Sequence, residues 1–112
     1  MEMKFSDLGS VRKVALIGRL DTAGVDRVES QFGAAIVPGG HNTVVDLSQV
    51  TFLASLGIRM LISTARSLSR KGGKIVMYGA SPAVMEIIDT TALQEIIPVA
   101  ATEQEAVAML SG

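Results

Sequence analysis

The chain has no cysteine and no tryptophan, and aromatic residues make up only 4% of its 112 positions. Without cysteine it forms neither disulfides nor thiolate metal sites, so a reducing compartment is permitted. So few aromatic rings leave little surface for stacking on bases or sugars. A net charge of −1 gives no basic footprint for nucleic acid, so we expect no nucleic-acid partner.

Long apolar runs and targeting signals are also missing. The N-terminal stretch MEMKFSDLGS lacks the hydrophobic segment of a signal peptide. No apolar run approaches the roughly 20 residues of a membrane-spanning helix. Hydrophobic residues still make up 48% of the chain, which is enough for an aliphatic core. We therefore expect one cytoplasmic domain over residues 1–112, with no membrane partner.

Strand-like and helix-like patterns alternate along the chain. Period-two or β-branched runs predict strands in MKFSDLG, VRKVALIGRL, TVVDL, KIVMYG and IIPVA. Helical spacing and capping signals predict helices after Asp21-Thr22, from Ser55 to Lys71, after Ser81-Pro82 and after Thr102. This order predicts an α/β fold with a mixed, mostly parallel sheet of about four to five strands, covered by about four helices.

Apolar stripes predict which side of each helix faces the core. The expected core residues of the first helix are Val25, Val28, Phe32 and Ile36, and those of the second are Ile58, Leu61, Ile62, Ala65 and Leu68. Arg59, Ser63, Arg66 and Arg70 form the opposite, polar side of the second helix. Pro98 favours an edge position for the last strand, since proline cannot donate to a sheet ladder.

The signals for catalysis, metals and cofactors are weak. His41, the single histidine, stands in a PGGHNT turn without an oriented partner, so we expect a structural role and no catalytic residue. No spacing of His or carboxylates predicts a metal site. Gly72-Gly73 follows a helix and precedes a strand, the reverse of a phosphate-binding loop, so no nucleotide cofactor is expected. Asp46 is expected at the end of a strand, where it either organises a turn with Ser48 or faces a ligand.

The stretch FLASLG places one hydroxyl, that of Ser55, where a strand and its loop lead into a helix. One interpretation is that Ser55 is the helix N-cap and nothing more, worth about 1 kcal/mol. The other is a modification site, because a helix N-terminus has unpaired amides and tolerates an added anion. A phosphate there would spare the fold and change what docks nearby.

Several motifs in the same order resemble the STAS domains, and more specifically the bacterial anti-sigma factor antagonists. GRLD, at residues 18–21, is similar to the family's GELD. VVDLSQVTFLASLGIRML resembles the family's DLSxVxFxDSSGLGxLL, and the stretch from KGGKIVMYG to EAVAML resembles the family's closing run of strands and helices. The resemblance covers nearly the whole chain and implies the STAS fold.

The resemblance also implies a partner switch and no enzymatic activity. In this family the unphosphorylated protein binds a serine-kinase anti-sigma factor, phosphorylation of a serine at the start of a helix breaks the complex, and a serine phosphatase resets it. The phosphorylated serine of the family maps onto Ser55. Two positions depart from the motif: Ala54 stands where the family has Asp, and Leu56 where it has a second serine. Ala54 cannot accept a hydrogen bond or orient the serine.

The residues and the resemblance together predict a partner-binding surface: Asp21, Thr22, Ala54, Ser55, Leu56, Gly57, Arg59, Met60 and Ser63. Leu56 and Met60 are the expected apolar anchors, with arginines at the rim. The alternative is that Met60 belongs to the core and the arginines only solvate the helix. For the whole protein the alternatives are a stand-alone STAS scaffold or a transporter-associated subunit without a phosphorylation switch, or partner switching that controls an output other than a sigma factor.

Overall fold

The computed structural model describes residues 1–111, and its elements follow the predicted order. The strands are β1 (Glu2–Leu8), β2 (Val11–Leu20), β3 (Thr43–Leu53), β4 (Ile75–Tyr78) and β5 (Val99–Ala100). The helices are α1 (Thr22–Ile36), α2 (Ser55–Ser69), α3 (Pro82–Thr90) and α4 (Glu103–Ser111), with a 3-10 turn, η1 (Leu93–Glu95), before β5. The predicted α/β class is confirmed.

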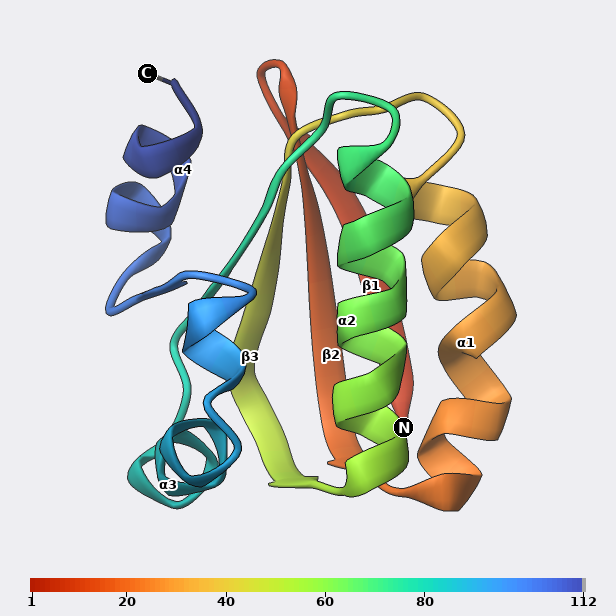
Figure 1. Cartoon of the computed structure of the whole chain (residues 1–112), viewed down its shortest axis with the longest axis vertical. Helices are drawn as coiled ribbons and strands as arrows, with labels where there is room; N and C mark the ends of the chain where they lie inside the picture. The colour runs from red at the N-terminus through yellow and green to blue at the C-terminus, as the bar shows by residue number, and fades with distance from the viewer. Residues whose placement is uncertain (112) are drawn as a thin grey trace.

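All five strands form one sheet in the order β1-β2-β3-β4-β5 (Figure 1). The hairpin partners β1 and β2 are antiparallel, and each later strand is parallel to its neighbour. A parallel neighbour requires a crossover, and the crossovers are made by helices. The sheet is therefore mixed and mostly parallel, as predicted, and β5 lies at its edge.

The sheet has a hydrophobic layer on each face. On one face, side chains of the central strands pack with α1, α2 and α3 in the larger core. On the other face, α4 covers a smaller cluster through Ala106 and Leu110. Figure 1 shows α1 and α2 side by side along the sheet, with α4 apart from them. Every residue of the predicted α1 stripe is buried: Val25, Val28, Phe32 and Ile36.

Local capping explains where three helices begin. The Asp21 carboxylate accepts a hydrogen bond from the Gly24 amide, with Oδ1 to N at 2.9 Å, and starts α1. The Ser81 hydroxyl caps α3, which has Pro at its first turn. At α4, the Glu105 amide donates to the Thr102 hydroxyl at 3.2 Å. These caps agree with the sequence signals.

The predicted position of Asp46 at a strand end is wrong. β3 is 11 residues long and continues to Leu53, so Asp46 lies within the strand. The prediction stopped at Leu47 because polar residues follow, but these sit at a register shift between β2 and β3. The Asp46 carboxylate accepts the Ser48 amide at 2.8 Å, but this bond lies within the strand at the register shift and not in the expected turn.

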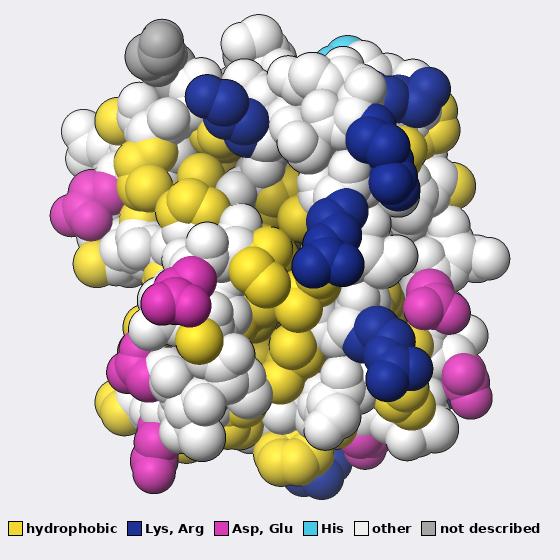
Figure 2. Space-filling model, in the orientation of Figure 1, with side chains coloured by type: hydrophobic (Ala, Val, Ile, Leu, Met, Phe, Trp, Pro, Cys, Tyr) yellow, Lys and Arg dark blue, Asp and Glu magenta, His cyan; other side chains and the backbone are white. Residues whose placement is uncertain are grey.

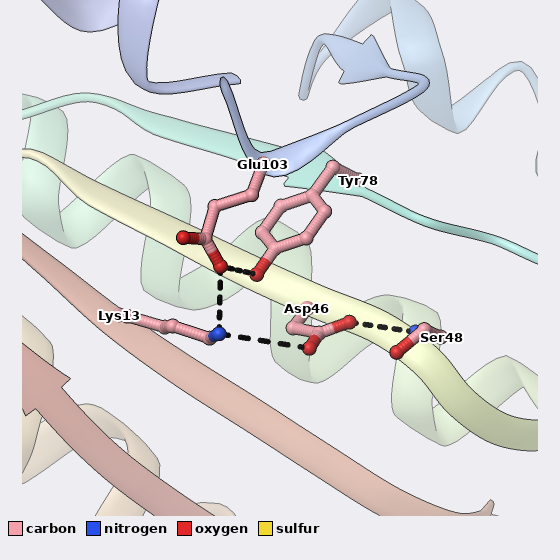
Figure 3. Close-up of polar contacts among 5 residues, drawn as sticks. All are labelled: Lys13, Asp46, Ser48, Tyr78 and Glu103. Atoms are coloured by element: carbon pink, nitrogen blue, oxygen red, sulfur yellow. Dashed lines mark hydrogen bonds and ion pairs between the residues drawn. The ribbon is translucent and has the colours of Figure 1, made fainter. Parts of the chain in front are cut away.

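Asp46 also belongs to a polar network beneath α4 (Figure 3). Lys13 Nζ lies 2.7 Å from Glu103 Oε2 and 4.0 Å from Asp46 Oδ2. The Tyr78 hydroxyl donates to the same Glu103 oxygen at 2.8 Å. Burial, and then the Glu103 carboxylate, raise the pKa of Tyr78, so this hydroxyl remains a donor. The network ties the first turn of α4 to the sheet.

The buried side of α2 is rotated from the predicted stripe. Its buried residues are Gly57, Met60, Leu61, Thr64 and Leu68. The predicted stripe members Ile58, Ile62 and Ala65 are only half-buried. α2 packs against α1 as well as the sheet, and the burial of Met60 shows that the helix is oriented by this tertiary packing and not by its own apolar stripe.

Candidate functional site: the surface around Ser55

Two neighbouring parallel strands end together and place the starts of α1 and α2 beside each other. Leu20, the last residue of β2, pairs with Leu53, the last residue of β3. The Ala54 amide then donates to the Leu20 carbonyl at 3.0 Å. Gly57 packs directly on this junction, because a Cβ there would lie 2.7 Å from Leu20 Cγ and 2.8 Å from its carbonyl oxygen. Glycine therefore lets α2 begin close against the sheet.

Ser55 is the first residue of α2 and is exposed to solvent. The residue before it, Ala54, is the N-cap and supplies no side-chain hydrogen bond. The first turn of α2 contains no acidic residue. Within residues 1–111, the Ser55 hydroxyl forms no hydrogen bond. An exposed hydroxyl thus stands at a helix N-terminus whose amides have no side-chain acceptor.

The interpretation of Ser55 as the N-cap is therefore wrong. The helix begins one residue earlier than a serine cap requires, because the extended residue that carries the cap position is Ala54. This leaves the Ser55 hydroxyl free of the local bond that capping would have given it.

Two residues that were not among the predicted site residues extend this surface. The Arg19 guanidinium lies over the Phe52 ring, 4.6 Å from its centroid, and Arg19 Nε is 3.3 Å from Asp21 Oδ2. Phe52 is 37% exposed, a large apolar side chain open to solvent three residues before Ser55 in the sequence. Thr51 and Phe52 are both exposed between the buried residues Val50 and Leu53, so simple strand alternation would not have identified Phe52.

The predicted site residues divide into an exposed set and a buried set. Thr22, Ser55, Leu56, Arg59 and Ser63 are exposed. Asp21 and Ala54 are half-buried, and Gly57 is buried where it packs on Leu20. Met60 is only 2% exposed and belongs to the core. The prediction of Met60 as an anchor presented to a partner is wrong, because Met60 is packed in the hydrophobic core.

The charges of the surface are balanced where α1 begins. The hydrogen bond from the Gly24 amide holds the pKa of Asp21 below its usual value, and Arg19 lowers it further. Asp21 is thus an anion in the neutral range. Arg59 stands one turn after Ser55 on α2, and no ion pair joins it to any other residue of the described chain.

The described residues hold no arrangement typical of metal or membrane chemistry. Residues 1–111 contain no group of three His or carboxylate side chains placed to bind a metal ion. No helix in the same range has the length and apolar character needed to cross a membrane. The surface around Ser55 presents an exposed hydroxyl, the exposed side chains of Phe52 and Leu56, and a few charges.

The fold is that of an α/β domain of the STAS type. The profile of the STAS domain family matches residues 4–106. The chain belongs to the STAS domain family.

Several of the relatives that the chain resembles along most of its length are anti-sigma factor antagonists. The chain is 24% identical over 108 residues to the putative anti-sigma factor antagonist BtrV of Bordetella bronchiseptica, covering 96% of this chain and 93% of that protein. Its structure is similar to that of an anti-sigma factor antagonist from Mycobacterium paratuberculosis, with a TM-score of 0.88, 27% identity, and coverage of 99% and 94%.

The fold is also that of SpoIIAA, an anti-sigma factor antagonist solved in two states. The unphosphorylated form has a TM-score of 0.78 at 20% identity, covering 99% of this chain and 97% of that chain. The phosphorylated form of the Bacillus protein has a TM-score of 0.70 at 20% identity, covering 96% and 98%.

Proposed function

We propose that this protein is a cytoplasmic anti-sigma factor antagonist that acts by partner switching. In its unphosphorylated form it binds a serine-kinase anti-sigma factor, and phosphorylation of Ser55 by that kinase releases it. A serine phosphatase then restores the binding form. The observation that carries the proposal is the exposed, unbonded hydroxyl of Ser55 at the N-terminus of α2.

A phosphate at Ser55 suits the helix that carries it. It would add about −1.5 to −2 charges at the positive end of α2, where negative charge is favourable. Arg59 follows one turn later and has no competing carboxylate in the described chain, so it is available to the phosphate. The modification therefore leaves the fold intact. That SpoIIAA, which shares this fold, has been solved in a phosphorylated form supports this step.

The same phosphate would disturb a partner that rests on this surface. Phe52 and Leu56 are 37% and 38% exposed, and they flank Ser55 in the sequence. A partner that buries these two side chains would bring its own atoms against the hydroxyl. A dianion placed within such an interface costs several kcal/mol of desolvation unless the partner supplies a counter-charge. Binding is lost although the fold is kept.

Ala54 changes how the kinase would recognise this site. The family motif has Asp at this position, whereas Ala54 offers no acceptor and no charge. The chain itself therefore does not hold the Ser55 hydroxyl in one rotamer, and we propose that the kinase orients it. The catalytic groups and ATP belong to the kinase in this scheme, and this chain is the substrate.

Phosphorylation by the bound kinase tests the proposal. The kinase partner is isolated from the source cell on immobilised Ser55→Ala protein and is incubated with the wild-type chain, ATP and Mg²⁺. Mass spectrometry should find one phosphate on Ser55 and none on Ser55→Ala. Ser63→Ala is the matched control, because Ser63 is an exposed serine on the same helix, and it should accept phosphate like the wild type.

Retention on the kinase supplies the second readout. Ser55→Ala should remain bound to the kinase, and Ser55→Asp should be released. Phosphate on another residue with Ser55 unmodified would refute the switch. Equal retention of both variants would favour a constitutive scaffold or transporter-associated subunit.

A further inference from the structure

The rotation of α2 leaves an apolar groove on the side of the helix away from α1. The half-buried side chains of Ile58, Ile62 and Ala65 lie on this side of α2, and Ala65 lines the groove. Ile96, which is 45% exposed, and Met109, which is 48% exposed, lie opposite. Figure 2 shows hydrophobic side chains in a band down the middle of this face, beside α2.

The deepest part of the groove lies between α2, β4 and α4. It has a volume of about 310 Å³ and is open along one side. Its lining includes Ala65, Ser69, Lys74, Ile75, Ile96 and Met109. Beyond this pocket, the apolar flank of α2 continues past Ile62 to Ile58, so the flank and the pocket together span roughly 16 Å along the helix, at 1.5 Å per residue. This length and shape suit an extended rod rather than a small molecule.

The charges beside the groove have one sign along α2. Arg59 and Arg66 follow directly after the apolar flank on the helix surface, and Lys74 is part of the groove lining. No ion pair joins any of these three to another residue within positions 1–111. In Figure 2 dark blue Lys and Arg side chains line the α2 side of the hydrophobic band. Across the groove, the exposed Glu95 adjoins Ile96, so the positive side is the α2 side.

We propose that this groove binds an acidic amphipathic helix of a partner protein. The apolar stripe of that helix would lie on Ile62, Ala65, Ile96 and Met109, and its carboxylates would face Arg66 and Lys74. A rod with one apolar and one acidic side satisfies both the shape of the groove and its unpaired cations. Anionic lipid is the less suitable occupant, because the cations follow one helix in a row instead of forming a flat patch.

The part of the groove proposed to hold the peptide, from Ile62 onward along α2, is distinct from the Ser55 surface, to which Arg59 belongs. Ala65, at the start of its deepest part, lies about 15 Å along α2 from Ser55. That distance exceeds the screening length of about 8 Å at physiological salt. The proposal therefore stands without the phosphorylation switch, and each can fail separately.

Two labelled peptides serve as probes for the groove. Both are helices of about 15 residues with leucines at i, i+3, i+4 and i+7. One carries Glu along one flank of the stripe, and the other carries Lys at the same positions. Fluorescence anisotropy should show the Glu peptide binding at least about tenfold more tightly than the Lys peptide at low salt, with the difference shrinking as salt rises. In NMR spectra of the protein, chemical-shift changes of the Ile62 and Met109 amides on addition of peptide show whether it binds in the groove.

Variants of the full chain identify the contact residues. Ile96→Asp, Met109→Asp and Arg66→Glu should each weaken binding of the Glu peptide by about tenfold or more. The two aspartate variants replace exposed side chains, and circular dichroism checks that each folds. Arg27→Glu, an exposed charge reversal on α1, and Ser55→Asp should bind like the wild type.

Three results would overturn the proposal: equal affinity for the Glu and Lys peptides, no effect of either aspartate variant, or binding only to vesicles of anionic phospholipid. If Ser55→Asp lost peptide binding while the groove variants kept it, the peptide would bind at the Ser55 surface, and the groove would not be a separate site.

Discussion

Replacing Gly57 by alanine tests how closely α2 must approach the sheet to place Ser55. The new Cβ would lie 2.7 Å from Leu20 Cγ and 2.8 Å from the Leu20 carbonyl oxygen. The carbonyl cannot move freely, since it accepts the Ala54 amide at 3.0 Å. Overpacking of this kind costs about 1–3 kcal/mol, while alanine regains up to about 1 kcal/mol of helix propensity over glycine. We expect Gly57→Ala to lower the free energy of unfolding by about 1–2 kcal/mol.

Gly33→Ala is the matched control, because it makes the same change in a helix without the contact. No atom lies within 4 Å of a Cβ at Gly33, which is in α1. Only the propensity gain and the smaller entropy of the unfolded chain remain, so this variant should be more stable by about 0.5–1 kcal/mol. The two variants should therefore shift stability in opposite directions.

Urea unfolding followed by circular dichroism measures both variants against the wild type. A change in the midpoint without a change in slope would show that the native packing is what differs. If Gly57→Ala were as stable as Gly33→Ala, the close approach of α2 to Leu20 would not restrict this position. The explanation of the glycine, and of how Ser55 is held at the sheet edge, would then be wrong.

Three further predictions concern charges. Asp21→Ala should lower the melting temperature at neutral pH, because it removes the cap of α1. The folded state lowers the pKa of Asp21, so the difference in melting temperature between wild type and variant should be largest above the usual pKa of 3.8 and should shrink as the pH falls below that value. Glu103→Ala should lower the free energy of unfolding by about 1 kcal/mol. Most of this loss comes from the buried Tyr78 hydroxyl, which loses its acceptor, because the partly exposed ion pair with Lys13 adds little. The hydrogen bond from Lys13 holds the pKa of Glu103 below 4.5, so this cost should be complete above that pH and fall in acid; a pH-independent cost would contradict it. Ser55→Asp should raise the free energy of unfolding by about 0.5 kcal/mol in thermal or urea melts, and a large loss would show that an anion is not tolerated there.

Most of the elements could be predicted because they depend on local chemistry. The stripe from Val25 to Ile36 made α1 recognisable, and all of its members are buried. Asp21 and Ser81 start helices through bonds to amides three residues later. The β3 strand was predicted too short, because polar residues after Leu47 read as a turn. A register shift against β2 allows those residues to continue the strand, and that shift involves a second segment of the chain.

The Ser55 site was predictable in its centre and less so in its surroundings. The exposed position of Ser55 follows from its place between a strand and a helix. The contact of Arg19 with Phe52 depends on the parallel register of β2 and β3, which no local pattern reveals. Met60 was misplaced because its burial depends on how α2 packs in the core with segments that are distant in the sequence.

The sequence by itself determined the alternation of strands and helices, the helix caps and the serine at the head of α2, since periodicity and capping act over a few residues. Only the tertiary structure decided how α2 is rotated and what that rotation exposes. The helix has apolar residues on more than half of its circumference, and contact with α1 on one flank selects which of them are buried. The other flank is left as the groove, because packing between distant segments, and not the helix's own pattern, fixes the orientation.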